Sequence, residues 1–336
     1  MELVRNESMV NVDIDALEQV GGIPLILRVD AYEGSATDWA RRHHRGLDQL
    51  LQSHGAVLVR GLKIHTSKQF GEFLEAAFGA PLLDYSYRST PRTELRGGVY
   101  TATEYPAEAV IPQHNEKAYS RSWPTRIGFF CMVVPGAGGE TPISDSRLLC
   151  RLLPQDLQDK FERLGVLYVR NYSSLDLPWQ EVFQTEVRSE VEESCRKHGL
   201  DFEWLGDDSL RTSQVNPAFA RHPVSGERLW FNQAHLFHVS NLPEEVRDTL
   251  IESLGQDHLP RNAYYGDGSP IEPDVLDLIR RIYEDTKIRF TWERNDLLLL
   301  NNMLFTHGRE SYSGERKILT GMACEFASDL AKESCA

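Results

Sequence analysis

Two polar residues stand two positions apart in the stretch IPQHNEKAYS, residues 111–120. In an extended segment the side chains of His114 and Glu116 point to the same face, so an imidazole and a carboxylate can converge on one metal ion. Taken alone, the H-x-E pair is a weak signal, because short motifs occur by chance and a hydrogen-bonded polar pair at a strand end also explains it. A metal site therefore requires a third ligand from elsewhere in the chain.

A candidate for that third ligand is His307, in the sequence LLLLNNMLFTHGRE. It follows an apolar segment that predicts a strand, and an inward-facing ligand at the mouth of a β-barrel occupies such a position. Two histidines and one carboxylate form the facial arrangement of non-haem Fe(II) sites, which leaves three positions for a cosubstrate and O₂. His114, Glu116 and His307 are the predicted metal ligands.

Two further residues could bind an organic acid beside such a metal. Arg316 lies nine residues after His307. A 2-oxo acid that chelates iron through its keto-acid end leaves its far carboxylate several ångströms away, and a bidentate guanidinium matches that group. Thr141, in GGETPISD, could donate its hydroxyl to the same carboxylate. Taken alone, Arg316 is better explained as a solvated strand-end arginine, and Thr141 is also explained as a turn threonine after two glycines.

The elements that must position these residues alternate along the chain. Buried or periodic apolar runs predict strands, and caps and glycines mark the helix ends. The predicted helices cover residues 36–55, 66–79, 154–165, 180–199, 243–255 and 271–286, and the predicted strands cover 56–61, 126–134, 296–309 and 316–326. Strands occur early, in the middle and late, which favours a mainly β core decorated by helices over a regular βαβ array.

Composition excludes several classes of protein. The 336 residues carry 36 basic and 50 acidic side chains, a formal net charge of −14, which disfavours nucleic acid and anionic membrane surfaces as partners. Five widely spaced cysteines without a CxxC pair fit reduced thiols better than a disulfide framework. No secretory signal or membrane span is visible, so a soluble, cytoplasmic protein is expected. The oligomeric state is not predicted.

Three longer blocks carry a resemblance to a known family. Residues 114–149 (HNEKAYSRSWPTRIGFF and onward), 221–240 (RHPVSGERLWFNQAHLFHVS) and 296–319 (DLLLLNNMLFTHGRESYSGERKIL) resemble the taurine dioxygenase-like (TauD/TfdA) Fe(II)/2-oxoglutarate oxygenases. Together with residues 84–106, they are most similar to the subgroup that contains the syringomycin-type aspartyl β-hydroxylase. The blocks occur in the family's order, so they are much more specific than the H-x-E pair.

The resemblance has consequences for the fold. It implies a double-stranded β-helix, or jelly roll, with helical insertions. The whole chain, 1–336, is expected to form a single oxygenase domain, with its core at about 50–326 and a helical insertion at about 150–290.

The resemblance also assigns cofactor residues. His114, Glu116 and His307 match the family's iron ligands. Arg316 matches its 2-oxoglutarate arginine, and Thr141 the threonine that assists that arginine. Fe(II), 2-oxoglutarate as cosubstrate and O₂ are the implied cofactors.

The implied reaction is oxidation of an unactivated C–H bond, with hydroxylation expected. The implied substrate is an amino acid or amino-acid-derived metabolite of natural product biosynthesis, free or tethered to a carrier protein. Desaturation or oxidative ring formation at the same iron is the alternative, and a non-catalytic jelly-roll binding protein is a second one. Glu116 argues against halogenation, because halogenating relatives lack a carboxylate there. Thr320 stands where the taurine-specific enzyme has a second arginine, so taurine is a poor substrate guess.

Residues for substrate recognition are less clearly marked. Arg88 could bind an amino-acid carboxylate, although a surface ion pair also explains it, and Asn232 lies in a block that matches the family's substrate side. His235 and His238 form an H-x-x-H pair, but without a third ligand nearby a separate zinc site is not expected.

Overall fold

An eight-stranded sheet forms the larger wall of the core. The computed structural model describes residues 12–16, 24–29, 32–84, 93–102, 105–173, 175–206 and 209–328. The strands of the large sheet are, in spatial order, β1 (Val12–Ala16), β2 (Leu25–Val29), β3 (Ala56–Arg60), β16 (Leu297–Asn301), β7 (Ser122–Val133), β19 (Lys317–Ala327), β5 (Val99–Thr101) and β4 (Glu94–Arg96). Neighbours are antiparallel except for β2 and β3, which run parallel.

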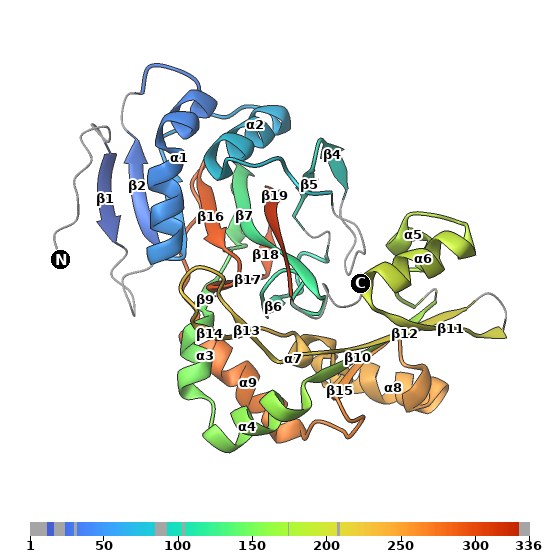
Figure 1. Ribbon diagram of the computed structural model, residues 1–336. Coiled ribbons are helices and arrows are strands. Elements are labelled where there is room, and N and C mark those ends of the chain that lie inside the picture. Colours follow the sequence, from blue (N-terminus) through green and yellow to red (C-terminus); the bar gives the residue numbers. More distant parts are fainter. Residues whose placement is uncertain are drawn as a thin grey trace.

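Two helices cover the outer face of this sheet (Figure 1). Helix α1 (Ala36–Ser53) and helix α2 (Ser67–Phe78) lie within two residues of their predicted ends. Thr66 caps α2 by accepting a hydrogen bond from the backbone N–H of Gln69 at 3.1 Å, and Gly79 ends it in the left-handed conformation at φ 64°. Successive side chains of the sheet alternate between this helix-covered face and the interior of the core.

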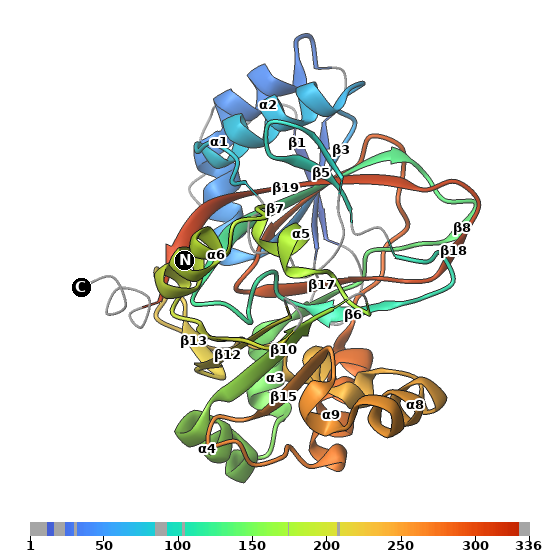
Figure 2. The ribbon, with the colours of Figure 1, turned by 90° about the vertical axis from the view of Figure 1, so that its right-hand side faces the viewer.

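A smaller sheet faces the inner side of the large one. Its three strands are β6 (Ile111–His114), β17 (Phe305–Arg309) and β9 (Ile143–Asp145), in the order β6-β17-β9. A short two-stranded antiparallel sheet, β8 (Ala137–Gly138) with β18 (Tyr312–Ser313), extends beyond it. A cluster of buried apolar residues fills the space between the sheets. Figure 2 shows β6 and β17 below β7 and β19, and the predicted jelly-roll core is confirmed.

One predicted strand, 296–309, is wrong as a single element. The chain forms β16, turns over residues 302–304, and enters the small sheet as β17. The Asn301 side chain accepts a hydrogen bond from the Met303 N–H at 3.2 Å, and the Asn301 carbonyl accepts one from the Leu304 N–H at 3.0 Å. These local hydrogen bonds take the place of inter-strand hydrogen bonds over residues 302–304, so the chain can leave the large sheet and enter the small one.

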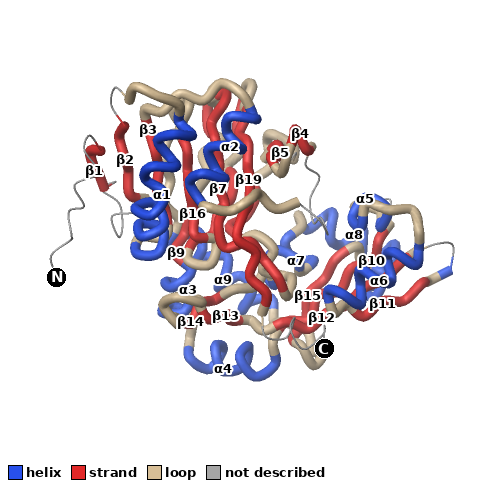
Figure 3. Tube along the Cα trace, turned by 45° about the horizontal axis from the view of Figure 1, so that its top comes forward, coloured by secondary structure: helices blue, strands red, loops and turns tan. Residues whose placement is uncertain are grey.

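The segment predicted as a helical insertion also contains strands. Its helices are α3 (Ser146–Leu152), α4 (Gln155–Leu164), α5 (Trp179–Phe183), α6 (Arg188–His198), α7 (Ala234–Phe237), α8 (Glu244–Leu254) and α9 (Pro273–Thr286), with 3₁₀ turns at Val239–Asn241 and Gln256–His258. A four-stranded antiparallel sheet, β11-β12-β10-β15, is built from Asp201–Trp204, Leu210–Asn216, Val166–Tyr172 and Arg261–Tyr265. The hairpin of β13 (Phe219–Arg221) and β14 (Arg228–Trp230) completes the segment. Figure 3 shows β10, β11 and β12 set apart from the large sheet.

The single helix predicted over 180–199 is two helices. Helix α5 ends where Gln184 adopts the left-handed conformation at φ 56°. The hydroxyl of Thr185 then accepts a hydrogen bond from the Val187 N–H at 3.1 Å and donates one to Glu190. A side chain that satisfies the backbone locally favours a turn over a continuous helix. Among the described residues, no helix has the length and apolar character needed to cross a membrane.

Candidate metal centre and adjoining cavity

The pairing of β6 with β17 brings the two predicted histidine ligands together. His114 and His307 are register partners across the strand pair, and their ring centroids lie 4.5 Å apart. Glu116 follows β6 at the start of a turn, and its Oε2 lies 3.7 Å from Nε2 of His307. One potential ligand atom from each of the three residues lies within 4.8 Å of the others. The structure thus assembles residues that are 191 positions apart, from His307 back to Glu116.

The surroundings suit a divalent cation. Nδ1 of His114 lies 2.8 Å from the carbonyl oxygen of Pro112, so Nδ1–H donates there and Nε2 carries the lone pair that can bind a metal. Glu116 and His307 are 2 % and 4 % exposed. A carboxylate buried this deeply is costly unless a positive charge compensates it. Two imidazoles and one carboxylate on one face are the donor set of non-haem Fe(II), so the residues fit that ion.

An amide network fixes the turn that carries Glu116. Oδ1 of Asn302 accepts a hydrogen bond from the Glu116 N–H at 2.7 Å, and its Nδ2 donates to the Glu116 carbonyl at 3.0 Å. Asn115 donates to the Asn302 carbonyl at 2.6 Å and to Ser146 Oγ at 3.1 Å. Gln233 donates to the Asn115 carbonyl at 2.6 Å. The sequence does not predict this network. The pair Asn301–Asn302 carries no local pattern that shows that Asn302 binds the backbone of Glu116.

A cavity adjoins the metal cluster. Strands of both sheets contribute to it, and its lining residues are Ala102, Ile111, His114, Phe129, Thr141, His307, Gly308, Arg309, Arg316, Ile318 and Thr320. The two predicted cofactor residues therefore lie beside two of the predicted metal ligands. This lining contains two arginines and no carboxylate, so the cavity favours an anion.

Arg316 and Thr141 contact each other in this cavity. Nη2 of Arg316 donates to Thr141 Oγ1 at 3.4 Å, and its Nε donates to the Gly139 carbonyl at 2.9 Å. The indole Nε1 of Trp292 also donates to Thr141 Oγ1, at 3.2 Å. Burial, and then the nearby charge of Arg309, lower the pKa of Arg316 to about 10. The guanidinium is still protonated at pH 7, and a bound carboxylate would compensate its buried charge.

Arg309 is a second buried arginine of the cavity, which the sequence did not single out. Its Nη1 donates to the Tyr105 carbonyl at 2.9 Å. Its Nη2 donates to the carbonyls of Pro106 at 2.5 Å and Ala109 at 2.7 Å. Burial lowers its pKa. Arg309 thus ties the loop before β6 to the strand that carries His307.

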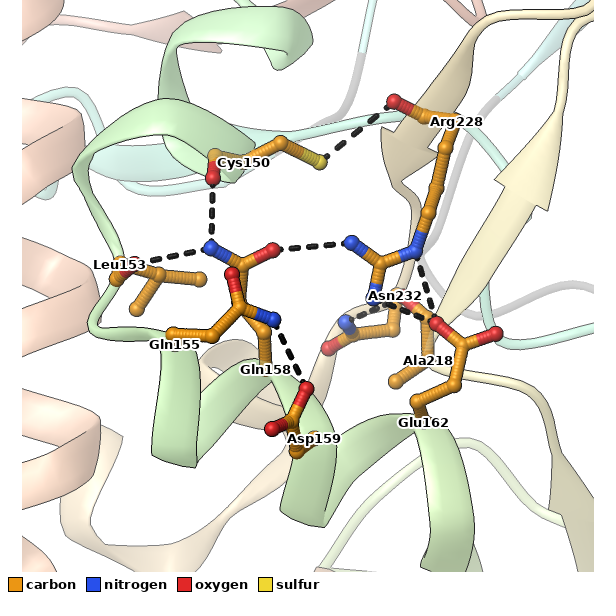
Figure 4. A network of polar contacts seen from close by, with 9 residues as sticks. All are labelled: Cys150, Leu153, Gln155, Gln158, Asp159, Glu162, Ala218, Arg228 and Asn232. Carbon is orange, nitrogen blue, oxygen red and sulfur yellow. Dashed lines mark hydrogen bonds and ion pairs between the residues drawn. The ribbon is translucent and has the colours of Figure 1, made fainter.

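Of the two predicted substrate residues, the structure describes Asn232. Arg88 falls outside the described residues. Asn232 is fully buried, its Nδ2 donating to the Ala218 carbonyl at 2.9 Å and its Oδ1 accepting from the Ala234 N–H at 3.1 Å. Figure 4 shows it beside Arg228, within a polar network of the insertion. Asn232 does not line the cavity at the metal cluster, and its role in substrate binding stays a prediction.

The H-x-x-H pair does not form a metal site in the described part of the chain. Nε2 of His235 lies 2.9 Å from the Gln113 carbonyl, whereas Nδ1 of His238 lies 2.8 Å from Ser240 Oγ. Of the described residues, only His114, Glu116 and His307 form a group of three or more potential ligands.

Comparison with known proteins places these features in a family. The model of the "Taurine catabolism dioxygenase TauD, TfdA family" matches residues 29–323. The "Dapdiamide synthesis protein DdaC" of Enterobacter agglomerans is 41 % identical over 300 residues, which cover 89 % of this chain and 91 % of that protein. A "Clavaminate synthase-like protein" of Arabidopsis thaliana is 31 % identical over 288 residues, 82 % of this chain and 83 % of that one.

Solved structures agree on the fold. The PvcB protein from Pseudomonas aeruginosa superposes with a TM-score of 0.56 at 16 % identity, over 96 % of this chain and 95 % of that one. A second PvcB structure, described as an Fe, alpha-ketoglutarate dependent oxygenase from an isonitrile synthetic pathway, gives the same TM-score at 15 % identity, over 98 % of this chain and 97 % of that one.

Proposed function

The chain belongs to the TauD/TfdA family of non-haem Fe(II)/2-oxoglutarate-dependent oxygenases, and from that premise we propose that His114, Glu116 and His307 bind the iron. The observation that carries this proposal is the buried cluster in which one ligand atom of each residue lies within 4.8 Å of the others. The strand pair supplies both histidines, and Asn302 positions the carboxylate through both backbone groups of Glu116.

We propose that the cavity beside this cluster binds 2-oxoglutarate. The distal carboxylate of 2-oxoglutarate pairs with the guanidinium of Arg316, and the neighbouring hydroxyl of Thr141 hydrogen-bonds to the same carboxylate. The apolar side chains of Phe129 and Ile318 line the same cavity and exclude water from the carbon chain of the cosubstrate. A charge-assisted bond in such a dry setting is stronger than the same bond in water.

The bound iron, with 2-oxoglutarate and O₂, supplies the oxidation of an unactivated C–H bond. The chain's own residues determine where that chemistry acts. The proposed ligands fix the metal on one face, and the Arg316 side chain fixes the cosubstrate beside it. Glu116 occupies a coordination position with a carboxylate, which supports oxygenation over halogenation.

The proposed substrate is a small amino-acid-derived molecule of a natural product pathway, and hydroxylation is the proposed outcome. The name of the relative from Enterobacter agglomerans, a dapdiamide synthesis protein, supports this class. The substrate is either free or tethered to a carrier protein, and Arg88 and Asn232 remain the predicted recognition residues. We also propose that residues 1–336 act as one oxygenase domain with its insertion at about 150–290.

Turnover tests the reaction class directly. The purified protein is incubated anaerobically with Fe(II) and 2-oxoglutarate, then given O₂ and a panel of amino acids and amino-acid amides, and succinate and product mass are followed. A product heavier by one oxygen indicates hydroxylation, whereas loss of two hydrogens indicates desaturation or ring formation. His114→Ala should abolish succinate formation, and the exposed histidine variant His65→Ala should leave it unchanged. Succinate formation that survives His114→Ala would contradict the proposal.

Cosubstrate binding is tested separately. Arg316→Met should weaken 2-oxoglutarate binding at least about thirtyfold, because it removes one partner of a buried charge pair. Metal affinity should change much less. Arg163→Met, at an exposed position of α4, is the matched control. Equal losses of metal and 2-oxoglutarate affinity in Arg316→Met would contradict the assigned role.

A further inference from the structure

A largely exposed loop, residues 105–110, lies between two residues that line the cavity beside the metal cluster. Ala102 precedes the loop and Ile111 follows it, and both line the cavity. The Ala102 N–H donates to the Ile318 carbonyl at 2.9 Å, and Ile111 pairs with Arg309 across β6 and β17. Because the flanking residues are fixed at the cavity wall, the conformation of the loop bears on how well this wall is closed.

Four carbonyl oxygens of the loop accept hydrogen bonds from residues 309–312. Three of these bonds come from the guanidinium of Arg309, at 2.9, 2.5 and 2.7 Å, and the carbonyls are those of Tyr105, Pro106 and Ala109. The fourth comes from the Tyr312 N–H, which donates to the Ala107 carbonyl at 2.9 Å. The planar fork of a guanidinium can reach three separate carbonyls, whereas an ammonium offers its donors from a single nitrogen. The loop thus depends mainly on one side chain.

The same side chain lines the cavity. Arg309 lies there with Arg316, and no carboxylate is among the lining residues. The Tyr312 ring contacts both arginines, its centroid 5.1 Å from Cζ of Arg309 and 5.6 Å from Cζ of Arg316. Burial, and then the charge of Arg309, lower the pKa of Arg316, so the two guanidiniums repel each other. The acidic residues whose charges act on them, Glu108 and Glu140, lie outside the lining.

An anion in the cavity changes this balance of charge. Its negative charge lies near both guanidiniums, so it stabilises Arg309 in place as well as Arg316. Without the anion, the repulsion is reduced when Arg309 moves away and releases the loop. The anchored and released states of the loop therefore differ in their affinity for an anion, which is the condition for coupling between two sites.

We propose that Arg309 couples the loop 105–110 to the cosubstrate cavity, so that a bound 2-oxo dicarboxylate strengthens the hydrogen bonds that hold the loop. By reciprocity, the anchored loop raises the affinity for the dicarboxylate by the same factor. Arg309 acts through the loop and through Arg316, so it is a positioning residue. The inference rests on the proposed binding of 2-oxoglutarate beside Arg316.

Hydrogen exchange of the full chain measures the state of the loop. The backbone amides of residues 105–110 are followed by mass spectrometry in the Co(II)-loaded protein, with and without saturating 2-oxoglutarate. We expect 2-oxoglutarate to slow their exchange at least about fivefold, the lower end of typical coupling between sites. The Co(II) absorption bands report in the same sample whether 2-oxoglutarate binds. Binding without slower exchange would overturn this inference alone, whereas no binding would overturn it together with the proposed function.

A charge-conserving variant separates coupling from a purely structural role. Arg309→Lys keeps the positive charge but loses the planar fork, so the loop should exchange equally fast with and without 2-oxoglutarate. The affinity for 2-oxoglutarate should fall by the factor by which 2-oxoglutarate slows exchange in the wild type, while the affinity for Co(II) stays unchanged. Arg163→Lys, at an exposed position of α4, is the matched control and should behave as the wild type.

The two roles of Arg309 give different results. A structural role alone makes the loop of Arg309→Lys exchange faster by equal factors with and without 2-oxoglutarate. That result, or an unchanged affinity for 2-oxoglutarate, would overturn the proposal. If Arg309→Lys does not fold, Arg309→Gln takes its place, and the absence of slower exchange in the wild type is decisive without any variant.

Discussion

Strands β16 and β17 follow one another in the chain, and all five residues of each are buried, yet the two strands have different roles. Strand β16 reads LLLLN and lies between β3 and β7 in the large sheet. Strand β17 reads FTHGR and lies between β6 and β9 in the small one. Equal burial therefore serves packing in the first strand and the positioning of polar groups in the second.

The difference lies in what holds each strand. The leucines of β16 alternate between the helix-covered face and the interior, and a regular ladder joins the strand to both neighbours. Strand β17 pairs with β6 at only two positions, with a bulge between His307 and Arg309. Where backbone pairing between β6 and β17 is sparse, the side chains of Asn302 and Arg309 hydrogen-bond to the Glu116 and Ala109 carbonyls, which flank β6. The geometry of the candidate site thus depends on few, specific polar contacts.

The largest expected effect tests the functional side of this comparison. His307→Gln should lower metal affinity by more than about 100-fold, because even the loss of a residue that supports a ligand costs 10- to 100-fold. Succinate formation should disappear with it. Metal binding is measured by titration with Co(II), whose absorption bands report coordination. Unchanged Co(II) absorption bands in His307→Gln would show that His307, and therefore β17, does not contribute a metal ligand.

The next effect tests the packing side. Leu299→Ala, on the helix-covered face of β16, should lower the free energy of unfolding by about 2–5 kcal/mol, since it leaves a cavity in a fully buried cluster. Denaturant unfolding gives this value. The folded fraction should bind Co(II) with the wild-type affinity. A large loss of metal affinity in Leu299→Ala would show that packing around β16 also determines metal binding at β17.

A smaller effect is expected at the turn between the two strands. Asn302→Ala removes both hydrogen bonds to the backbone of Glu116 and should lower metal affinity by about 10- to 100-fold. His307 itself is untouched, so the Co(II) complex should still form at high metal concentration. A loss of stability without any change in metal affinity would mean that Asn302 serves only the packing of the turn.

The two strands also differ in how far the sequence predicts them. The LLLL run identifies β16 because apolar pattern and burial coincide there. The predicted continuation through residue 309 fails, because Asn302 binds a backbone that lies 186 positions earlier. The three proposed ligands could be predicted from the sequence because a short H-x-E motif and the family blocks mark them, and the structure brings them together. Gln113, Arg309 and Gln233 carry no such mark, since their partners are set by tertiary contacts.

The smallest expected effect compares two threonines of one cavity. Thr141 Oγ1 lies 3.4 Å from Arg316 Nη2, whereas Thr320 Oγ1 is buried without a partner in the described part of the chain. Thr141→Val should raise the dissociation constant of 2-oxoglutarate by about two- to tenfold, because one neutral hydrogen bond contributes about 0.5–1.5 kcal/mol. Thr320→Val, which has the same change of shape, should alter it less. Titration of the anaerobic Fe(II) protein, followed by its charge-transfer absorption, measures both. A larger effect at Thr320 than at Thr141 would place the cosubstrate carboxylate nearer to β19 than the Arg316–Thr141 contact does.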